Sequence, residues 1–244
     1  MKDVLLKIES NEFLTESVCK MVLSGDLSEI STPGTFVNFK IDGLFLRRPI
    51  SVCDCENGML TVIYKVVGKG TEKMSLMKAG ESLQTLTGLG NGYDTSKAGA
   101  HPVLLGGGVG VPPLYMLAKK LLKEGKKVSV VLGFNTASEV FYGEEFMALG
   151  ADVRVATADG SCGIKGFVTD AMPGDYTYFY TCGPEPMLRA VYKKTVTGGQ
   201  FSFEERMGCG FGACMGCSCK TITGFKRICK DGPVLEKEEI LWEN

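Results

Sequence analysis

Short runs rich in apolar and β-branched side chains alternate with turn-forming residues over the first part of the chain. This pattern predicts strands over residues 4–10, 17–25, 34–41, 49–55, 59–67 and 81–88. One helix is expected over residues 71–79, between the last two strands. Short strands at such spacing are typical of a small antiparallel barrel. The glycine-rich, polar stretch 88–99 then marks a domain boundary.

Beyond this boundary, apolar runs alternate with segments whose apolar side chains recur at helical spacing, such as Leu114, Leu117 and Leu121. The pattern predicts strands over residues 101–108, 126–134, 151–159 and 175–184 and helices over 111–125, 138–150 and 185–194. Strands that alternate with helices form a parallel sheet with crossover helices. The periodicity fails after about residue 198.

These changes of pattern divide the chain into three parts. We expect an antiparallel β-barrel over residues 1–95, a parallel-sheet α/β domain over 96–197 and a small C-terminal module over 198–244. The expected fold class is therefore multidomain β plus α/β. The C-terminal module is too small to bury a core of its own, so a bound metal would help it to fold.

The charge balance excludes several classes of partner. With 27 basic and 28 acidic side chains the formal net charge is -1, which gives no sequence-wide electrostatic reason to bind nucleic acid or an acidic membrane. The N-terminus lacks an apolar segment of signal-peptide length, and no stretch approaches the roughly 20 apolar residues of a membrane span. We therefore expect a cytoplasmic protein. In that reducing compartment, 10 cysteines against 1 histidine indicate metal or redox chemistry rather than disulfides.

The segment CGFGACMGC in the C-terminal module has the spacing Cys-x4-Cys-x2-Cys. Cys209, Cys214 and Cys217 match the first part of the plant-type ligand pattern of a [2Fe-2S] cluster, which a more distant cysteine completes. The fourth ligand is either Cys219 or Cys229. Cys219 follows Cys217 by only two residues and would need a very tight loop, so we favour Cys229. A zinc site is less favoured because zinc usually takes two short CxxC-like pairs and only one is present; inert thiols are the remaining interpretation.

Two turns of the α/β domain, each where a strand enters a helix, have features of a nucleotide site. The first is GGGVGVPP at residues 106–113, and the second is CGPEPM at 182–187. A glycine turn lets a dinucleotide approach the helix N-terminus, where free amides favour phosphate. The first turn does not match the GxGxxG register, but both would share the C-terminal edge of one parallel sheet, where ligands bind. The candidate binding residues are Gly106, Gly107, Gly108, Gly110, Cys182, Gly183, Glu185 and Met187.

In the barrel, Arg48-Pro49-Ile50-Ser51 places a basic residue and a hydroxyl beside a rigid turn, and Gly70-Thr71 lies at a helix terminus that can hold phosphate. Taken alone, these are a strand start and a helix cap. Followed by GGGVGVPP, CGPEPM and CGFGACMGC in this order, they resemble the ferredoxin-reductase superfamily, and within it the electron-transfer subunits of type B dihydroorotate dehydrogenase. The resemblance spans essentially the whole chain. It implies an FAD-binding barrel, an NAD-binding α/β domain and a [2Fe-2S] module.

The resemblance also implies which residues hold each cofactor. The flavin of FAD would be lined by Arg48, Pro49, Ile50 and Ser51, contacted by Ile63, Tyr64 and Lys65, and held at its pyrophosphate by Gly70 and Thr71. The nicotinamide would have Cys182 as its catalytic neighbour, the NAD phosphates would lie over the turn from Gly106 to Gly110, and the cluster would be bound by Cys209, Cys214, Cys217 and Cys229. Segment 133–143 has no Arg or Lys to pair with a 2′-phosphate, which favours NAD over NADP.

NADH gives up two electrons at once as a hydride and a [2Fe-2S] cluster accepts one at a time, so a flavin must stand between them. By the resemblance, electrons run from an FMN-containing dihydroorotate dehydrogenase catalytic subunit through this chain to NAD+, in a pyrimidine-biosynthesis heterotetramer with two copies of each subunit. Two rival hypotheses stay open. One is a flavin and iron-sulfur subunit of another ferredoxin:NAD(P)+ oxidoreductase or of a sulfide dehydrogenase. The other is a non-enzymatic, zinc-stabilised binding protein, against which the glycine-lined turns of both domains argue.

Overall fold

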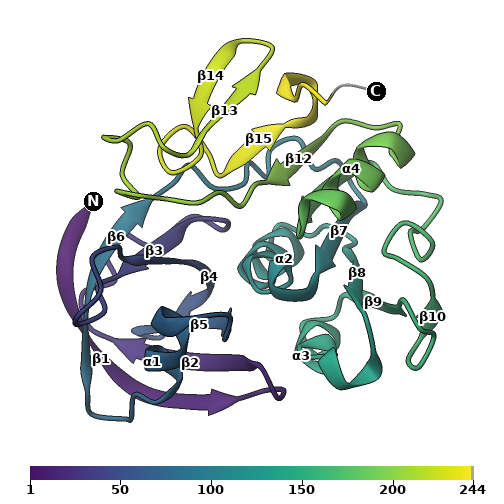
Figure 1. Cartoon of the computed structure of the whole chain (residues 1–244). Coiled ribbons are helices and arrows are strands. Elements are labelled where there is room, and N and C mark those ends of the chain that lie inside the picture. Colours follow the sequence, from purple (N-terminus) through teal and green to yellow (C-terminus); the bar gives the residue numbers. More distant parts are fainter. Residues whose placement is uncertain (243–244) are drawn as a thin grey trace.

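The N-terminal part of the chain is a closed antiparallel barrel. The computed structural model describes residues 1–242 (Figure 1). The barrel strands are β1 (Lys2–Phe13), β2 (Val18–Ser24), β3 (Phe36–Phe39), β4 (Arg48–Glu56), β5 (Met59–Lys65) and β6 (Ser82–Leu89). Their order around the barrel is β1-β2-β5-β4-β3-β6, and a short helix, α1 (Lys69–Ser75), connects β5 to β6. The expected barrel is thus confirmed.

Alternation of buried and solvent-facing side chains explains why these strands close on themselves. In β6 every second residue from Leu83 to Leu89 is buried, while the residues between them are exposed or half-buried. β3 is instead buried along its whole length. Its Val37 and Phe39 pack in the barrel core, whereas Phe36 packs among residues of the C-terminal module. One strand of the barrel is therefore covered from outside.

A second sheet forms the α/β domain (Figure 1). Its parallel strands are β7 (Pro102–Gly107), β8 (Ser129–Phe134), β9 (Asp152–Thr157), β10 (Ile164–Lys165) and β11 (Tyr178–Cys182), and its helices are α2 (Pro113–Lys123), α3 (Gly143–Ala148) and α4 (Glu185–Lys194). The sheet order is β10-β9-β8-β7-β11-β12-β15. The last two strands, β12 (Gly199–Ser202) and the antiparallel β15 (Val234–Glu236), come from beyond residue 198. The C-terminal module therefore shares its sheet with the α/β domain.

The helix expected over residues 138–150 is wrong in its first part. A 3-10 turn, η2 (Ala137–Glu139), is followed by α3, and Tyr142 between them is left-handed with φ 67°. The Tyr142 ring is buried and packs edge-on against Tyr115, with ring centroids 5.2 Å apart. Core packing of this ring pulls the backbone out of the helical conformation.

Within residues 1–242, no helix combines the length and the apolar character that crossing a membrane requires.

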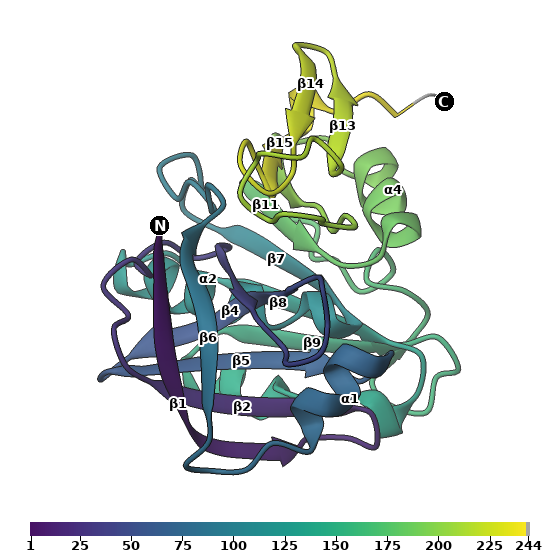
Figure 2. The ribbon, with the colours of Figure 1, turned by 60° about the vertical axis from the view of Figure 1, so that its left-hand side comes forward.

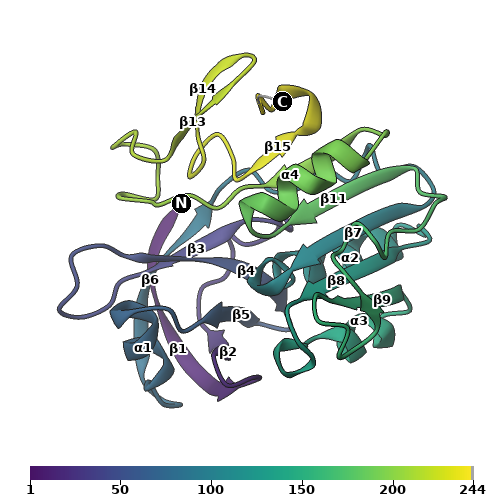
Figure 3. The same cartoon turned by 45° about the vertical axis from the view of Figure 1, so that its right-hand side comes forward.

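The C-terminal module lies over both the barrel and the edge of the α/β sheet (Figures 2 and 3). It contains a hairpin of β13 (Ser218–Thr221) and β14 (Gly224–Arg227) and a 3-10 turn, η3 (Lys237–Glu239). Its Ile228 is fully buried and packs with Phe36 and Leu89 of the barrel and Leu235 of β15. The module thus takes its apolar core from its neighbours, as its small size requires.

The barrel and the α/β domain are also packed on each other. Cys53 and Ile63 of the barrel belong to the same buried cluster as Leu114 of α2. Beside this cluster, Lys119 Nζ lies 2.8 Å from Asp54 Oδ2 on β4. Partly exposed ion pairs contribute about 0–1 kcal/mol each, so the apolar contact supplies most of the energy. The ion pair fixes α2 against the strand that carries Arg48 to Ser51.

Candidate functional site

The two glycine-containing turns of the α/β domain lie against each other at the C-terminal edge of the sheet. β7 and β11 are parallel neighbours, and Cys182 is paired with Gly106. Gly110 comes so close to the second turn that a Cβ atom on it would collide with the carbonyl group of Cys182. The structure therefore brings together the two turns that the sequence placed at one sheet edge, where ligands bind in folds of this class.

Met187 at the start of α4 closes the two turns from the helix side. Its Sδ would collide with a Cβ on Gly107, and its Cε would lie 2.7 Å from a Cβ on Gly183. Gly108 is different, because its φ is +52° and a Cβ there would meet nothing within 4 Å. Gly110 is thus needed for close packing against backbone and Gly107 and Gly183 make room for Met187, whereas Gly108 borders open space with room for a phosphate-bearing ligand.

Cys182 ends β11 at this edge and is half-buried. Burial raises the pKa of its thiol to about 12, and a hydrogen bond with Ser202 offsets this only in part. The neighbouring Thr181 carbonyl accepts a hydrogen bond of 3.2 Å from the Tyr93 hydroxyl. This bond attaches the linker between the barrel and the α/β domain, residues 88–99, to the end of the strand. Reactive cysteines are thiolates, so Cys182 presents a neutral, packed thiol rather than a nucleophile.

A cleft of about 30 Å³ opens where the end of β5 meets the first glycine turn. It is lined by Thr15, Ser17, Val18, Lys65, Gly108, Val109, Phe134, Glu139 and Phe141. Glu139 is held in place because its carboxylate accepts hydrogen bonds from the backbone N–H and the side-chain Nδ2 of Asn135, at 3.1 Å and 2.8 Å. The cleft joins a predicted flavin contact, Lys65, to a predicted NAD contact, Gly108.

Arg48, at the start of β4, lies across the first turn of α1. A Cβ on Gly70 would collide with the guanidinium group of Arg48, so glycine is the residue that lets this cation approach the helix. The Nη1 of Arg48 also donates to the Leu46 carbonyl at 2.7 Å, which fixes the guanidinium in place. A guanidinium beside the free amides of a first helical turn suits a pyrophosphate. The resemblance implied that Gly70 and Thr71 hold the pyrophosphate and that Arg48 lines the flavin; the guanidinium beside Gly70 makes Arg48 suited to the pyrophosphate as well.

Two of the expected FAD contacts, Thr71 at the pyrophosphate and Tyr64 at the flavin, use their side chains elsewhere. Thr71 caps its own helix, because its Oγ1 accepts from the Gly68 N–H at 3.3 Å and donates to the Gly68 carbonyl at 3.1 Å. Tyr64 is only 2% exposed, and its hydroxyl donates to Asn11 Oδ1 at 3.0 Å inside the barrel. Thr71 and Tyr64 could therefore contact FAD through their backbone, whereas the side chain of Ile63 faces the α/β domain.

The cysteine loop, defined here as residues 208–217, points backbone amides at sulfur. Cys209 Sγ accepts hydrogen bonds from the N–H groups of Ala213 at 3.2 Å and Cys214 at 3.4 Å. Cys214 Sγ accepts from Gly216 at 3.5 Å. Amides directed at sulfur stabilise the thiolates that ligate iron-sulfur clusters and tune their potentials. The loop therefore has the donor chemistry of such a site.

The thiols of the module differ in how readily they ionise. Burial raises the pKa of Cys209, but hydrogen bonds from the backbone amide of Phe211 and its neighbours outweigh burial and lower the pKa to about 6. Burial, together with contact with the Cys217 thiol, raises the pKa of Cys229 to about 12. The Cys229 N–H donates to Cys217 Sγ at 3.4 Å, so these two buried residues lie side by side.

The four expected ligands form two pairs in the chain alone, Cys209 with Cys214 and Cys217 with Cys229. Among residues 1–242, no three cysteine, histidine or carboxylate side chains converge on one point as the ligands of a loaded metal site do. The donor set nevertheless fits an iron-sulfur cluster, because it consists of cysteines whose sulfurs face amides. The pairing of Cys217 with Cys229 supports Cys229 as the fourth ligand, which stays a prediction.

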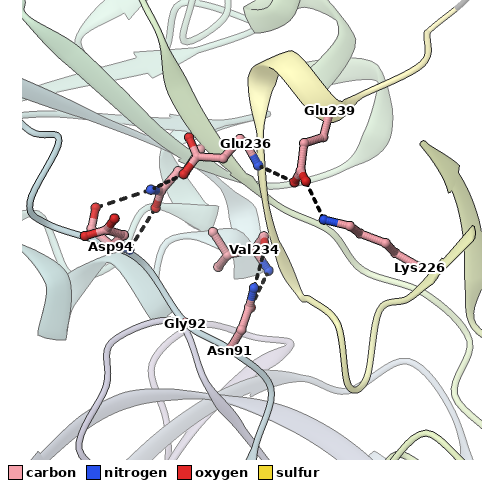
Figure 4. Close-up of a pocket in the computed structure, with 8 residues that line it drawn as sticks. Asn91, Gly92, Asp94, Lys226, Val234, Glu236 and Glu239 are labelled. Carbon is pink, nitrogen blue, oxygen red and sulfur yellow. Dashed lines mark hydrogen bonds and ion pairs between the residues drawn. The ribbon is translucent and has the colours of Figure 1, made fainter. Parts of the chain in front are cut away.

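A larger pocket, of about 140 Å³, lies away from these features, where the linker, the sheet edge and the hairpin meet (Figure 4). It is lined by Asn91, Gly92, Asp94, Gln200, Lys226, Val234, Glu236 and Glu239. Its polar groups bond one another: Gln200 Nε2 donates to Glu236 Oε1 at 3.0 Å, and Lys226 pairs with Glu239. The pocket therefore joins the C-terminal module to the sheet.

Three residues that contact the expected sites or the strands that hold them belong to no sequence motif: Lys119, Glu139 and Asn38. Lys119 and Glu139 become visible only through contacts between distant segments. Asn38 does carry a signal in the sequence, because it is the single polar residue in the otherwise apolar strand FVNF. Its side chain reaches the cysteine loop, where Nδ2 donates to the Cys209 carbonyl at 3.3 Å.

Comparison with known proteins gives matches over the same regions. Residues 204–241 match the family described as the iron-sulfur cluster binding domain of dihydroorotate dehydrogenase B, and residues 104–193 match the oxidoreductase NAD-binding domain. The chain is 43% identical to the dihydroorotate dehydrogenase B (NAD(+)) electron transfer subunit of Bacillus caldolyticus, over 97% of both chains. It is 42% identical to that of Fusobacterium nucleatum, over 93% of this chain and 94% of the relative. A solved NADH-dependent reduced ferredoxin-NADP oxidoreductase is 30% identical, with a TM-score of 0.88 over 98% of this chain and 90% of that one.

Proposed function

Because this chain belongs to the family of dihydroorotate dehydrogenase B electron transfer subunits, we propose that it carries electrons between a catalytic subunit that oxidises dihydroorotate and NAD+, in pyrimidine biosynthesis. The observation that carries the proposal is the strand order β5-β4-β3 in the barrel wall. The α/β domain packs on β5 through Ile63 and on the later part of β4 through Cys53, and the cysteine loop rests on the β3 side through Asn38. The expected flavin-lining segment of β4 therefore lies between them.

Each part of the chain then has its own task. A bound FAD supplies the exchange between the two-electron chemistry of a nicotinamide and the one-electron chemistry of a [2Fe-2S] cluster. Arg48 and the first turn of α1 hold the FAD pyrophosphate, and the paired glycine turns hold NAD(H) at the sheet edge, where Gly108 leaves room. The iron is held by Cys209, Cys214, Cys217 and Cys229.

Cys182 positions the nicotinamide as an uncharged neighbour. Because burial raises the pKa of its thiol to about 12, the group is protonated at neutral pH. A thiolate at this place would stabilise the cationic ring of NAD+ relative to NADH by direct Coulomb attraction. The neutral thiol exerts no such bias. Met187 packs against Gly107 and Gly183 and so supports the turns from below.

The finer features of the complex rest on the family resemblance. We propose that the partner contains FMN, that two copies of each subunit form a heterotetramer, and that the complex works in the cytoplasm. All ten cysteines are free thiols within the described part of the chain, which supports a reducing compartment. Native mass spectrometry of the co-expressed subunits tests the stoichiometry, and a mass of one copy of each subunit would contradict it.

A second candidate function is that of a flavin and iron-sulfur subunit in a ferredoxin:NAD(P)+ oxidoreductase. The likeness to the NADH-dependent reduced ferredoxin-NADP oxidoreductase favours it. The two candidates differ in the protein that receives or supplies electrons at the cluster. Affinity purification of the native complex distinguishes them: recovery of a subunit that oxidises dihydroorotate supports the first candidate, and recovery of a ferredoxin-dependent partner supports the second.

The test of the electron path is an anaerobic titration of the purified holoprotein with NADH, followed by absorption and EPR spectroscopy. We expect the flavin absorption to bleach and a reduced-cluster EPR signal to appear in the same titration. A colourless protein that carries zinc would refute electron transfer altogether. Bleaching of the flavin without a cluster signal would remove the cluster from the path.

A further inference from the structure

β3 separates the cysteine loop from the segment expected to line the flavin. On one edge it pairs with β4, with Asn38 opposite Pro49 and Phe39 opposite Arg48. On its outer face, Phe36 packs in the same buried cluster as Cys217 and Cys229. This strand therefore contacts both of the expected redox sites.

Asn38 is the residue of β3 that touches the cysteine loop through a polar contact. Its Nδ2 donates to the Cys209 carbonyl at 3.3 Å. Gly210, the next residue of the loop, has φ +78°, and a Cβ on it would collide with Asn38 Nδ2. Glycine at this position is thus what allows the loop to descend onto Asn38. The contact is built from both sides.

The other end of the Asn38 side chain is unpaired. Asn38 is 1% exposed, and among residues 1–242 no group donates a hydrogen bond to its Oδ1. Turning the amide over would place Oδ1 against the Cys209 carbonyl oxygen, where two acceptors would face each other. An unpaired buried acceptor costs about 1–3 kcal/mol. An apolar residue of the same size would avoid this cost, so stability alone does not explain asparagine here.

We propose that Asn38 is a positioning residue for electron exchange between the cluster and the flavin, an inference that rests on the proposed function. Its Nδ2 holds the Cys209 end of the cysteine loop at a fixed height above the β3–β4 pair. Asn38 itself exchanges neither electron nor proton. Its contribution is to keep the distance between the two redox sites short and constant while single electrons pass between them.

The test uses Asn38→Leu in the holoprotein. Leucine has the same branching and the same number of side-chain heavy atoms, removes the bond to Cys209 and also removes the unpaired acceptor, so the free energy of unfolding should stay equal or rise. The cysteine loop should nevertheless be freed: hydrogen exchange of residues 208–217 should increase roughly 2- to 10-fold, the range expected for loss of one hydrogen bond. In stopped flow, NADH should bleach the flavin at the wild-type rate, while the cluster should be reduced more slowly by a similar factor.

Two further variants keep the result interpretable. Gly210→Ala disrupts the same contact from the loop side, because its Cβ would collide with Asn38 Nδ2. It should therefore also raise hydrogen exchange in residues 208–217. Thr85→Val changes a buried polar residue of β6 opposite Phe39, away from the cysteine loop, and should leave loop exchange and cluster reduction unchanged. If Asn38→Leu does not retain a cluster, the exchange measurement is made on the cluster-free proteins, where the bond to Cys209 is already present.

The outcomes separate this inference from the proposed function. A wild-type protein with no NADH-dependent cluster signal refutes the proposed function, whatever the variants do. A wild-type protein that transfers electrons, with an Asn38→Leu variant of equal loop exchange and equal cluster reduction, overturns only the role of Asn38. Loss of global stability in Asn38→Leu without a change in loop exchange would also overturn it, because asparagine would then be merely structural.

Discussion

The glycine turns of the α/β domain and the cysteine loop are both tight loops, but they hold their shapes by different means. In the turns, neighbouring backbone and side chains fill the space beside every glycine except Gly108: Gly110 lies against Cys182, and Gly107 lies against Met187. In the cysteine loop, the cysteine sulfurs accept hydrogen bonds from the backbone amides, and Cys214 is exposed to solvent. The polypeptide alone therefore fixes the first site, whereas the second has its geometry completed by the metal it binds.

The largest effect is expected from the choice of the fourth cluster ligand. Cys229→Ser should lose the cluster, so the reduced-cluster EPR signal should fall by more than about tenfold. Mutation of a residue that only supports a metal ligand already lowers metal affinity about 10- to 100-fold, and loss of a ligand should lower it at least as much. Cys219→Ser, its matched control two residues beyond Cys217, should keep the signal. Loss of the cluster in Cys219→Ser together with its retention in Cys229→Ser would reverse the ligand assignment.

Removal of the cluster tests the contrast between the two sites directly. After chelation of iron under reducing conditions, we expect amide hydrogen exchange in residues 208–217 to rise at least about tenfold, because the loop loses its bound metal. Exchange in residues 102–123, which carry the first glycine turn, should not change. If both regions loosened together, the two sites would form one cooperative unit and the contrast would be wrong.

Overpacking should damage the glycine turns and leave the cysteine loop intact. Gly110→Ala forces a Cβ against the Cys182 carbonyl, so we expect a loss of about 1–3 kcal/mol in the free energy of unfolding and slower reduction of the flavin by NADH. The cluster EPR signal, generated with dithionite, should persist. Gly174→Ala is the control, because a Cβ there meets nothing within 4 Å. Equal stability of the two variants would show that the turns are not closely packed.

The sequence predicted those features that depend on local pattern. The six barrel strands and the βα alternation follow from side-chain periodicity, and the two glycine turns meet because parallel strands bring their C-terminal ends to one edge. The interruption at Tyr142 was not predictable, since it arises from packing against Tyr115, a residue of another helix. Nor was the role of β12 and β15, because short buried strands leave little periodicity to detect.

For the expected site residues, too, the sequence predicted the residues themselves but not the contacts that they make with distant parts of the chain. Motifs identified Arg48 and Gly70 separately, but only the fold shows that the guanidinium lies on the glycine. The resemblance assigned Thr71 to the FAD pyrophosphate and Tyr64 to the flavin, yet their hydroxyls are bonded within the chain. A motif predicts which residues lie near a ligand, whereas the partners of each side chain depend on segments far away in the sequence.

The smallest expected effect is the contribution of the Cys182 thiol to the pH dependence of stability, which tests how closely the second glycine turn is packed. The pKa of this thiol is raised by burial from an ordinary value near 9.0 to about 12 in the folded protein. Between these values the unfolded chain loses a proton that the folded chain keeps, so wild-type stability falls as pH rises, by about 1.4 kcal/mol per pH unit from this group. Below pH 9 both states are protonated and the group contributes no slope.

Cys182→Ser removes this titration. In urea unfolding of the FAD-loaded protein at pH 8 and pH 10, the variant should therefore lose less stability than wild type, by roughly 1 kcal/mol. The pair measured at pH 8 serves as the reference, because only the change between the two pH values reports the thiol. An equal loss in both proteins would mean that Cys182 ionises as freely in the folded chain as in the unfolded one, and that the packed turn does not shield it from water.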